Sequence, residues 1–368
     1  MKFKTLLLGS AAALVVAGGA QAADLSIAEP VDYVRICDAF GTGYWYIPGT
    51  DTCLKIGGKV QFDARFFDLA DVYYGVGTSA STTFDHSAQW SFITEVGLNF
   101  TAKSMTEYGV LTGYIALVAK SDNSSYDGGG GVSGYKLVKL DNAYLEFGNV
   151  LMGWTGSLYD YGGGYTYDGS IHSDTKTDQV RFTWAAAGFG FALSVEDPRD
   201  RWGTSLGTTY SMPDIIAALT MSQGSWDAKL SAGFTEGGGY IGSGLSGWGI
   251  QGAVTVKLDS IAPGDELRLK AAFANNAGSF VGGPLISGSN WSALASIKHY
   301  FTPMVAGALT FAYLNNGATT AAPAANYNVA GNLVWYPAAG ASFGAQVLYA
   351  NVGGTGAVSV RLQGKREW

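Results

Sequence analysis

The segment LKIGGKVQFDARF, residues 54–66, alternates between two chemistries with a period of two. Every even-numbered position is apolar or small. The odd-numbered positions include four charged residues, Lys55, Lys59, Asp63 and Arg65. Successive side chains of a β-strand point to opposite faces, so this segment predicts a strand with one apolar and one charged face. Such a strand suits a soluble sandwich, or a membrane barrel with lipid outside and a watery lumen inside.

The same alternation recurs along the chain and predicts an all-β protein of sixteen strands. It is clear at 90–100, 180–184, 189–195, 226–234, 248–258, 267–273, 291–301, 305–313, 327–335, 343–349 and 358–362. It is weaker at 105–118, 138–147, 150–156 and 213–222. Segments of about 10 residues, tilted by about 40°, would cover the apolar band of an outer membrane.

The connections between these segments alternate in length. Short turns occur at 148–149, 186–188, 223–224, 302–303 and 337–340, and long polar loops at 67–86, 119–137, 157–177, 197–212 and 276–289. Sandwich loops have no reason to sort by length, whereas outer-membrane barrels have short turns at one end and long loops at the other. The sequence therefore predicts an antiparallel transmembrane β-barrel over residues 54–368.

The N-terminus has the order of a secretory signal peptide, predicted over residues 1–22. Lys2 and Lys4 precede an apolar run, and Ala20-Gln21-Ala22 forms a small-x-small cleavage site. The run is shorter than the roughly 20 residues of a spanning helix. We expect an exported chain that crosses the bacterial outer membrane with strands.

The composition excludes some partners. Charged residues make up 14% of the chain, against roughly 25% in ordinary soluble domains. Loss of Lys2 and Lys4 with the signal peptide lowers the formal charge from −7 to −9. An acidic chain without clustered Lys and Arg argues against a nucleic-acid partner.

The two cysteines, Cys37 and Cys53, lie close together ahead of the first strand. Exported proteins meet an oxidising compartment, so a disulfide is expected. Two Cys without a nearby His pair make a poor zinc site. We expect the bridge to hold an N-terminal periplasmic segment, residues 23–53, against the barrel.

Residues 31–66, VDYVRICDAFGTGYWYIPGTDTCLKIGGKVQFDARF, resemble the trimeric general porins of alphaproteobacterial outer membranes. The resemblance extends through AYLEFGNVLMGWTGSLYDY and the YFTP turn to the C-terminal aromatic residue, and so over the mature chain. It implies a 16-stranded barrel, a homotrimer, and passive diffusion of small hydrophilic solutes and ions. It also implies that the third long loop, about 157–177, folds inward to narrow the pore.

The implied inward loop carries two acids, Asp160 and Asp168, among many Tyr and Gly residues. Few acids argue against a strongly cation-selective constriction. Strand parity and the implied loop together predict a set of pore-lining residues: Lys55, Lys59, Asp63, Arg65, Glu95, Asp160, Asp168 and Arg181. Opposed charges of this kind orient dipolar solutes and set ion preference. Some of them could instead only solvate the wall or hold the loop to it.

An enzyme is not expected. The three histidines, His86, His172 and His299, have no Ser partner in a recognisable arrangement, and no metal-ligand spacing or cofactor motif is present. Two alternatives to a general porin stay open at this stage. One is a channel specific for a sugar or an anion, and the other is a structural or adhesive barrel.

Overall fold

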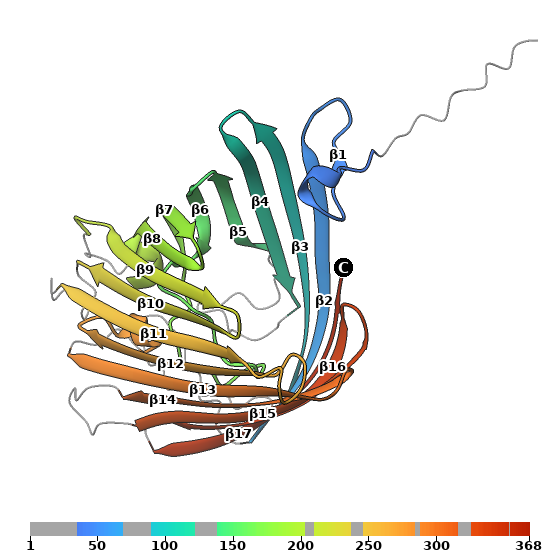
Figure 1. The fold of residues 1–368 in the computed structure, drawn as a ribbon. Helices are drawn as coiled ribbons and strands as arrows, with labels where there is room; N and C mark the ends of the chain where they lie inside the picture. The colour runs from blue at the N-terminus through green and yellow to red at the C-terminus, as the bar shows by residue number, and fades with distance from the viewer. Residues whose placement is uncertain are drawn as a thin grey trace, which may run out of the picture.

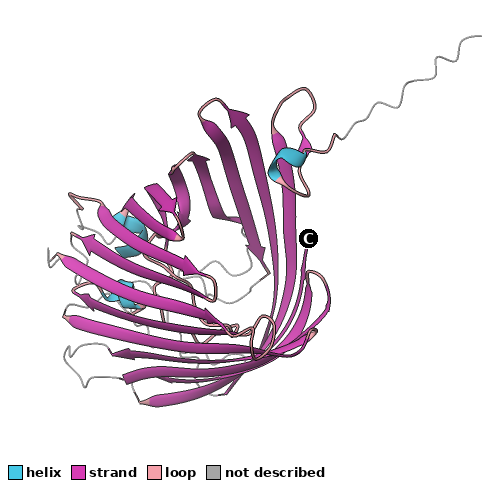
Figure 2. Cartoon of the chain, viewed as in Figure 1, coloured by secondary structure: helices cyan, strands magenta, loops and turns pink. Residues whose placement is uncertain are grey.

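A computed structural model describes residues 35–68, 90–121, 138–202, 210–236, 246–283, 288–315, 325–352 and 354–368. The predicted signal peptide lies outside these described residues. The described chain is almost entirely β-structure, with one short α-helix and two 3-10 turns (Figure 2). No helix among the described residues is long and apolar enough to cross a membrane.

Sixteen strands form one closed antiparallel barrel. Each strand from β2 to β16 pairs with the next one along the chain, and β17 pairs with β2 to close the wall (Figure 1). The strands are β2 (Cys53–Asp68), β3 (Trp90–Thr106), β4 (Gly109–Lys120), β5 (Val138–Phe147), β6 (Val150–Gly156), β7 (Lys176–Ala186), β8 (Phe189–Glu196), β9 (Asp214–Gln223), β10 (Trp226–Thr235), β11 (Gly247–Lys257), β12 (Glu266–Asn275), β13 (Ser289–Thr302), β14 (Val305–Asn315), β15 (Ala325–Ala338), β16 (Ala341–Val352) and β17 (Thr355–Glu367). The predicted fold class and strand number are confirmed.

The outer face of the barrel is apolar, as the alternation predicts. On β2 and β3 most of the exposed residues are large and apolar, among them Ile56, Val60, Phe62, Phe66, Trp90, Phe92, Val96 and Leu98. Phe62 and Phe92 are in contact, with ring centroids 5.7 Å apart. Exposed apolar side chains over so large an area would be unfavourable in water, and they are stabilised when hydrocarbon covers them.

An N-terminal module, residues 35–53, stands at the short-turn end of the barrel, beyond the start of β2 (Figure 1). It contains the 3-10 turn η1 (Asp38–Phe40) and the short strand β1 (Trp45–Tyr46), which pairs with the start of β2. Cys37 and Cys53 are joined by the predicted disulfide, with Cα atoms 6.0 Å apart. Both cysteines are buried, so the bridge holds the module to β2.

One side of the barrel interior is filled by an apolar core. Inward-facing alanines of the wall, with Ile216, Leu294 and Leu314, pack against residues from the loops. Those loop residues come from 157–175, from the helix α2 (Pro198–Trp202) and from the 3-10 turn η2 (Gly278–Val281). The small wall residues leave the space that these segments occupy, so the lumen beside β8–β14 is packed with protein.

Phe280 of η2 lies fully buried inside this core. Its ring packs directly on the backbone of β10 and β11 at Gly233 and Gly249. A Cβ at Gly233 would lie 2.6 Å from Cζ of Phe280. The two glycines are therefore required by the close approach of this ring.

Candidate channel lumen and inward loop

The third long loop lies inside the barrel, as the family resemblance implies. It spans residues 157–175, because Lys176 and Thr177, which we predicted as loop residues, belong to β7. From β6 the loop runs along the inner wall past β10–β14 and reaches β16 and β17. The open part of the lumen is therefore bounded by this loop on one side and by β2–β7 on the other.

Side chains of the wall hold the loop by its backbone carbonyl oxygens. Lys229 Nζ donates to the carbonyls of residues 158 and 160, each at 2.7 Å. Gln251 Nε2 donates to the carbonyl of Tyr159 at 2.9 Å. Further along, Lys270 donates to residue 162 at 3.3 Å and Arg268 to residue 163 at 2.6 Å. These cations neutralise the partial charges of carbonyl groups that would otherwise be buried without partners.

The tip of the loop is fastened to the seam where the barrel closes. Arg361 Nη1 of β17 donates to both carboxylate oxygens of Asp168 at 2.9 Å. The same guanidinium donates through Nε and Nη2 to Asp63 of β2, also at 2.9 Å. Gln346 Oε1 of β16 accepts from the backbone N–H groups of Tyr167 and Asp168. Asp63 is only 2% exposed, so its carboxylate faces protein.

The base of the loop is held by a buried polar network around Arg201 of α2. Arg201 donates to Ser173 Oγ at 2.9 Å and to Ser157 Oγ at 2.6 Å, at the two ends of the loop. Ser157 Oγ donates to Glu196 at 2.6 Å. The guanidinium also lies 3.8 Å from the Asp214 carboxylate. These three charged side chains are at most 1% exposed.

Asp160 is hydrogen-bonded within the loop itself. Its carboxylate accepts from Ser173 Oγ at 2.5 Å and from the backbone N–H of Thr175 at 2.7 Å. The carboxylate therefore closes the loop on itself, and the Asp160 side chain stays partly exposed.

The remaining predicted residues lie on the open side of the lumen. Lys59 and Glu95 form an ion pair at 2.5 Å, and Lys120 joins Glu95 at 3.1 Å. Arg65 is partly exposed and makes no ion pair with any described residue. Arg181 donates to Gln179 Oε1 and to the carbonyl of residue 156.

Lys55 lies nearer the short-turn mouth, with Nζ 5.7 Å from the ring centroid of Tyr44. Strand parity thus predicts that the cations of β2 and β7 lie on the lumen side. It does not indicate which charged side chains anchor the loop. The anchors that it missed include Arg361, Gln346 and Arg201, together with the wall residues that bind the loop carbonyls. Parity alone would put Arg361 and Gln346 on the inner face, and nothing in the sequence marks their partners.

The loop brings several titratable side chains inside the barrel. Burial, with a smaller effect from nearby Lys270, lowers the pKa of His172 to about 4. Burial raises the pKa of Tyr165 and of Tyr167 to about 12. All three are therefore neutral near pH 7 and add no charge to the lumen.

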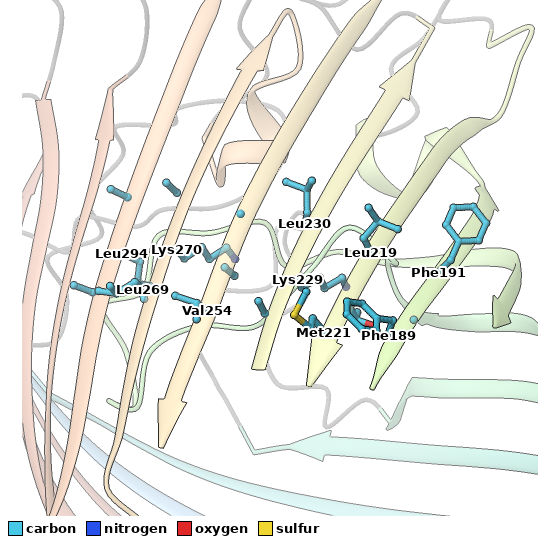
Figure 3. A pocket seen from close by; sticks show the side chains of 18 of the residues that line it. Phe189, Phe191, Leu219, Met221, Lys229, Leu230, Val254, Leu269, Lys270 and Leu294 are labelled. Carbon is cyan, nitrogen blue, oxygen red and sulfur yellow. The ribbon is translucent and has the colours of Figure 1, made fainter. Parts of the chain in front are cut away.

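An apolar hollow of about 910 Å³ lies on the opposite face of the wall, across β8–β14 (Figure 3). Leu219, Leu230 and Leu269 line it beside alanines and glycines, and these leucines belong to the lipid-facing set. The hollow is therefore part of the hydrocarbon-facing surface and is not a solute site. No group of three or more His, Cys, Asp or Glu able to hold a metal ion occurs in the described parts of the chain.

A closed sixteen-stranded barrel with an apolar exterior, a charged lumen and a long loop fastened inside defines the porin class of outer-membrane barrels. The family model described as the porin subfamily matches residues 24–366. The chain belongs to this porin subfamily.

Two relatives come from alphaproteobacteria. The Sinorhizobium fredii protein y4fJ, named as an outer membrane protein, is 38% identical over 200 residues, which are 54% of this chain and 55% of y4fJ. Porin Omp2b of Brucella suis is 36% identical over 243 residues, which are 61% of this chain and 64% of Omp2b. The chain thus matches between half and two thirds of the length of these relatives.

Solved structures show the same fold at low identity. The outer membrane channel DcaP of Acinetobacter baumannii has a TM-score of 0.70 at 16% identity, covering 88% of this chain and 99% of DcaP. Salmonella typhi OmpF, in a complex with daunomycin, has a TM-score of 0.62 at 12% identity, with 88% and 99% covered. The trimer form of Vibrio cholerae OmpT has a TM-score of 0.59 at 9% identity, with 87% and 100% covered.

Proposed function

We propose that this protein is an outer-membrane porin, a water-filled channel for passive diffusion of small hydrophilic solutes and ions. The observation that carries the proposal is the division of the wall, with large apolar residues outside and charged residues inside. A water-filled lumen supplies the solvation that the inner charges need, whereas a dry interior would leave Arg65 unpaired at high cost. No catalytic role is proposed, since the chain belongs to a family of channels.

Within this channel, we propose that the solute-facing charges come mainly from the open side. Lys55, Lys59, Arg65, Glu95 and Arg181 fit this role because they are partly or fully exposed on the lumen side. Asp160 would act indirectly, by fixing where the loop narrows the passage. Asp63 and Asp168, which both bind Arg361, would act in the same way. Opposed charges around such a passage bias the entry of ions and orient polar solutes.

We also propose that three copies associate, with β5–β7 facing the threefold axis. β6 has seven residues, which at about 3.3 Å per residue and a tilt of about 40° rise only about 18 Å. That height is less than the apolar band of about 25 Å that a lipid-facing wall needs. A low wall is stable where other protein covers it. The OmpT structure described as a trimer form supports the same assembly.

The channel proposal is tested with the mature protein in planar lipid bilayers. We expect a large ohmic conductance that appears in groups of three equal steps. Liposome swelling should fall smoothly with the mass of neutral sugars. Absence of conductance from protein that is correctly inserted would contradict the proposal and favour a structural or adhesive barrel.

The assembly proposal has its own test. Met152 is an outward residue of β6 and Leu309 one of β14. Chemical cross-linking in mild detergent should trap trimers of the unchanged protein and of Leu309→Arg. The same treatment of Met152→Arg should give only monomers. Equal effects of the two substitutions would refute the placement of the axis.

A further inference from the structure

A band of tyrosines and cations covers the lumen wall between the inward loop and the short-turn end. We call it the basic–aromatic surface and define it as Tyr165 of the loop, Arg268 of β12, Lys298 and Tyr300 of β13, and Tyr336 of β15. All five side chains are partly exposed. Lys298 and Tyr300 follow Ser296, the residue that contacts the loop, in the direction of the short turn at 303–304. The surface therefore lies in the path of a solute that passes the loop.

The rings and the cations interleave along this surface. The Arg268 guanidinium carbon is 4.7 Å from the Tyr165 ring centroid, and Lys298 Nζ is 5.2 Å from the same ring. Lys298 Nζ is also 5.5 Å from the Tyr300 ring. The rings of Tyr300 and Tyr336 follow at a centroid distance of 6.2 Å. Each cation thus has an aromatic face beside it.

The charge of the surface is positive and incompletely satisfied. Lys298 lies 3.4 Å from Glu266, and both side chains are partly exposed. Arg268 has no carboxylate within 4.0 Å among the residues that the structure describes. Its Nη1 donates to the carbonyl of residue 163 at 2.6 Å and its Nε to Thr255 Oγ1 at 3.2 Å. A guanidinium has five N–H donors, so Arg268 retains donors for a ligand.

We propose that the basic–aromatic surface binds small organic anions that carry a flat apolar ring. A carboxylate would accept hydrogen bonds from Arg268 and Lys298 while the ring lies on Tyr300 or Tyr336. This inference rests on the proposed channel function and assigns a preferred class of solute to the lumen. A solute with only one of the two features would lose half of the contacts.

Benzoate, acetate and benzyl alcohol separate the two features. Each is added at equal concentration, first to one side and then to the other, of bilayers holding the full mature protein in KCl. We expect benzoate to reduce the single-channel current saturably and with a Kd at least fivefold lower than acetate or benzyl alcohol. Equal effects of benzoate and acetate would overturn the proposal, because charge alone would then account for binding.

Two substitutions address the surface without removing a hydrogen bond to the loop. Lys298→Gln and Tyr300→Leu should each weaken benzoate binding about threefold to tenfold, the range expected for loss of one cation–π or stacking contact. Lys103→Gln is the matched control, since Lys103 is a lumen-side cation of β3 on the opposite wall. A control effect as large as that of Lys298→Gln would refute the site.

The outcomes distinguish this inference from the function on which it rests. A channel that conducts but shows no preference for benzoate would remove the inference and leave the porin function intact. A protein without conductance would remove both. Should Tyr300→Leu fail to insert, Lys298→Gln still tests the surface.

Discussion

The buried cation of the short helix α2 gives the sharpest test of how the loop is held. Arg201→Met removes a guanidinium that is 1% exposed. The equally buried carboxylates of Glu196 and Asp214 then lose the positive charge that lies between them and repel each other. Removing one partner of a buried ion pair typically costs about 3–5 kcal/mol. The methionine retains apolar contact with Phe280, on whose ring the guanidinium lies at 4.6 Å, so the loss is mainly electrostatic.

The barrel is closed by hydrogen bonds between its own strands and not by the loop or α2, so we expect this energy to appear as local opening of the loop. A cost of 3–5 kcal/mol raises the open population by a factor of at least about 100. Hydrogen exchange of residues 157–175, measured by mass spectrometry on protein in lipid vesicles, reports that population. We expect the protection of this peptide to fall by about two orders of magnitude while β-strand peptides keep theirs.

Arg199, two positions earlier in the same helix, provides the matched control. Its ion pair with Asp197 is on the surface, with 65% of the arginine side chain exposed. Surface pairs contribute little, so Arg199→Gln should leave loop protection unchanged. Neutralising Glu196 in the background of Arg201→Met should restore part of the protection. Equal exchange in Arg201→Met and Arg199→Gln would show that the buried network does not position the loop.

Three further predictions concern other parts of the chain. Leu269→Arg places a charge on the lipid face of β12 and should make insertion into vesicles less favourable by about 2–4 kcal/mol. The folded fraction on heat-shift gels measures this effect, and unchanged folding would contradict the lipid-facing assignment. Substituting Ser for both Cys37 and Cys53 should make residues 35–53 sensitive to protease, since a bridge over 16 positions stabilises by about 3 kcal/mol, while the barrel core stays resistant. The pKa of His172 is lowered to about 4, so as pH falls from about 6.5 towards 4 the opened loop binds a proton that the packed loop does not, and the packed loop loses stability. The protection factor of residues 157–175, which is the intrinsic exchange rate at each pH divided by the observed rate, should therefore fall below pH 6.5 and stay constant above pH 7, and His172→Gln should abolish the change.

The wall of the barrel could be predicted because the alternation of apolar and polar residues is visible within each strand by itself. Lipid on one side and water on the other impose a period of two at every position, so even the weakly alternating segment 150–156 was found with the bounds of β6. The short strand β1 was not found, since two residues cannot show a period. The expected strand 105–118 was placed too early, because β3 continues to Thr106 before the chain turns.

The interior could not be predicted in the same way, because its contacts join residues that are far apart in the sequence. Asp168 and Arg361 are 193 residues apart, and neither neighbourhood differs from an ordinary polar loop or an ordinary strand. The segment 276–289 reads as a polar, Gly-rich loop, yet Phe280 within it is completely buried. The Phe280 ring can pack there because Gly233 of β10 and Gly249 of β11 have no side chain. In the sequence these glycines appear only as residues that interrupt the alternation of two strands.

Burial separates two kinds of charge that strand parity treats as one. Arg361 and Asp63 face inward but are covered by protein, and the Arg361 guanidinium is neutralised by the carboxylates of Asp63 and of Asp168 in the loop. Arg65 and Arg181 also face inward, remain partly exposed and pair with no described carboxylate. A charge in contact with water and without a counter-charge acts on a passing ion, whereas a neutralised buried pair acts mainly on the shape of the passage. The anchors should thus determine which solutes fit, and the few unpaired cations should determine which charges pass.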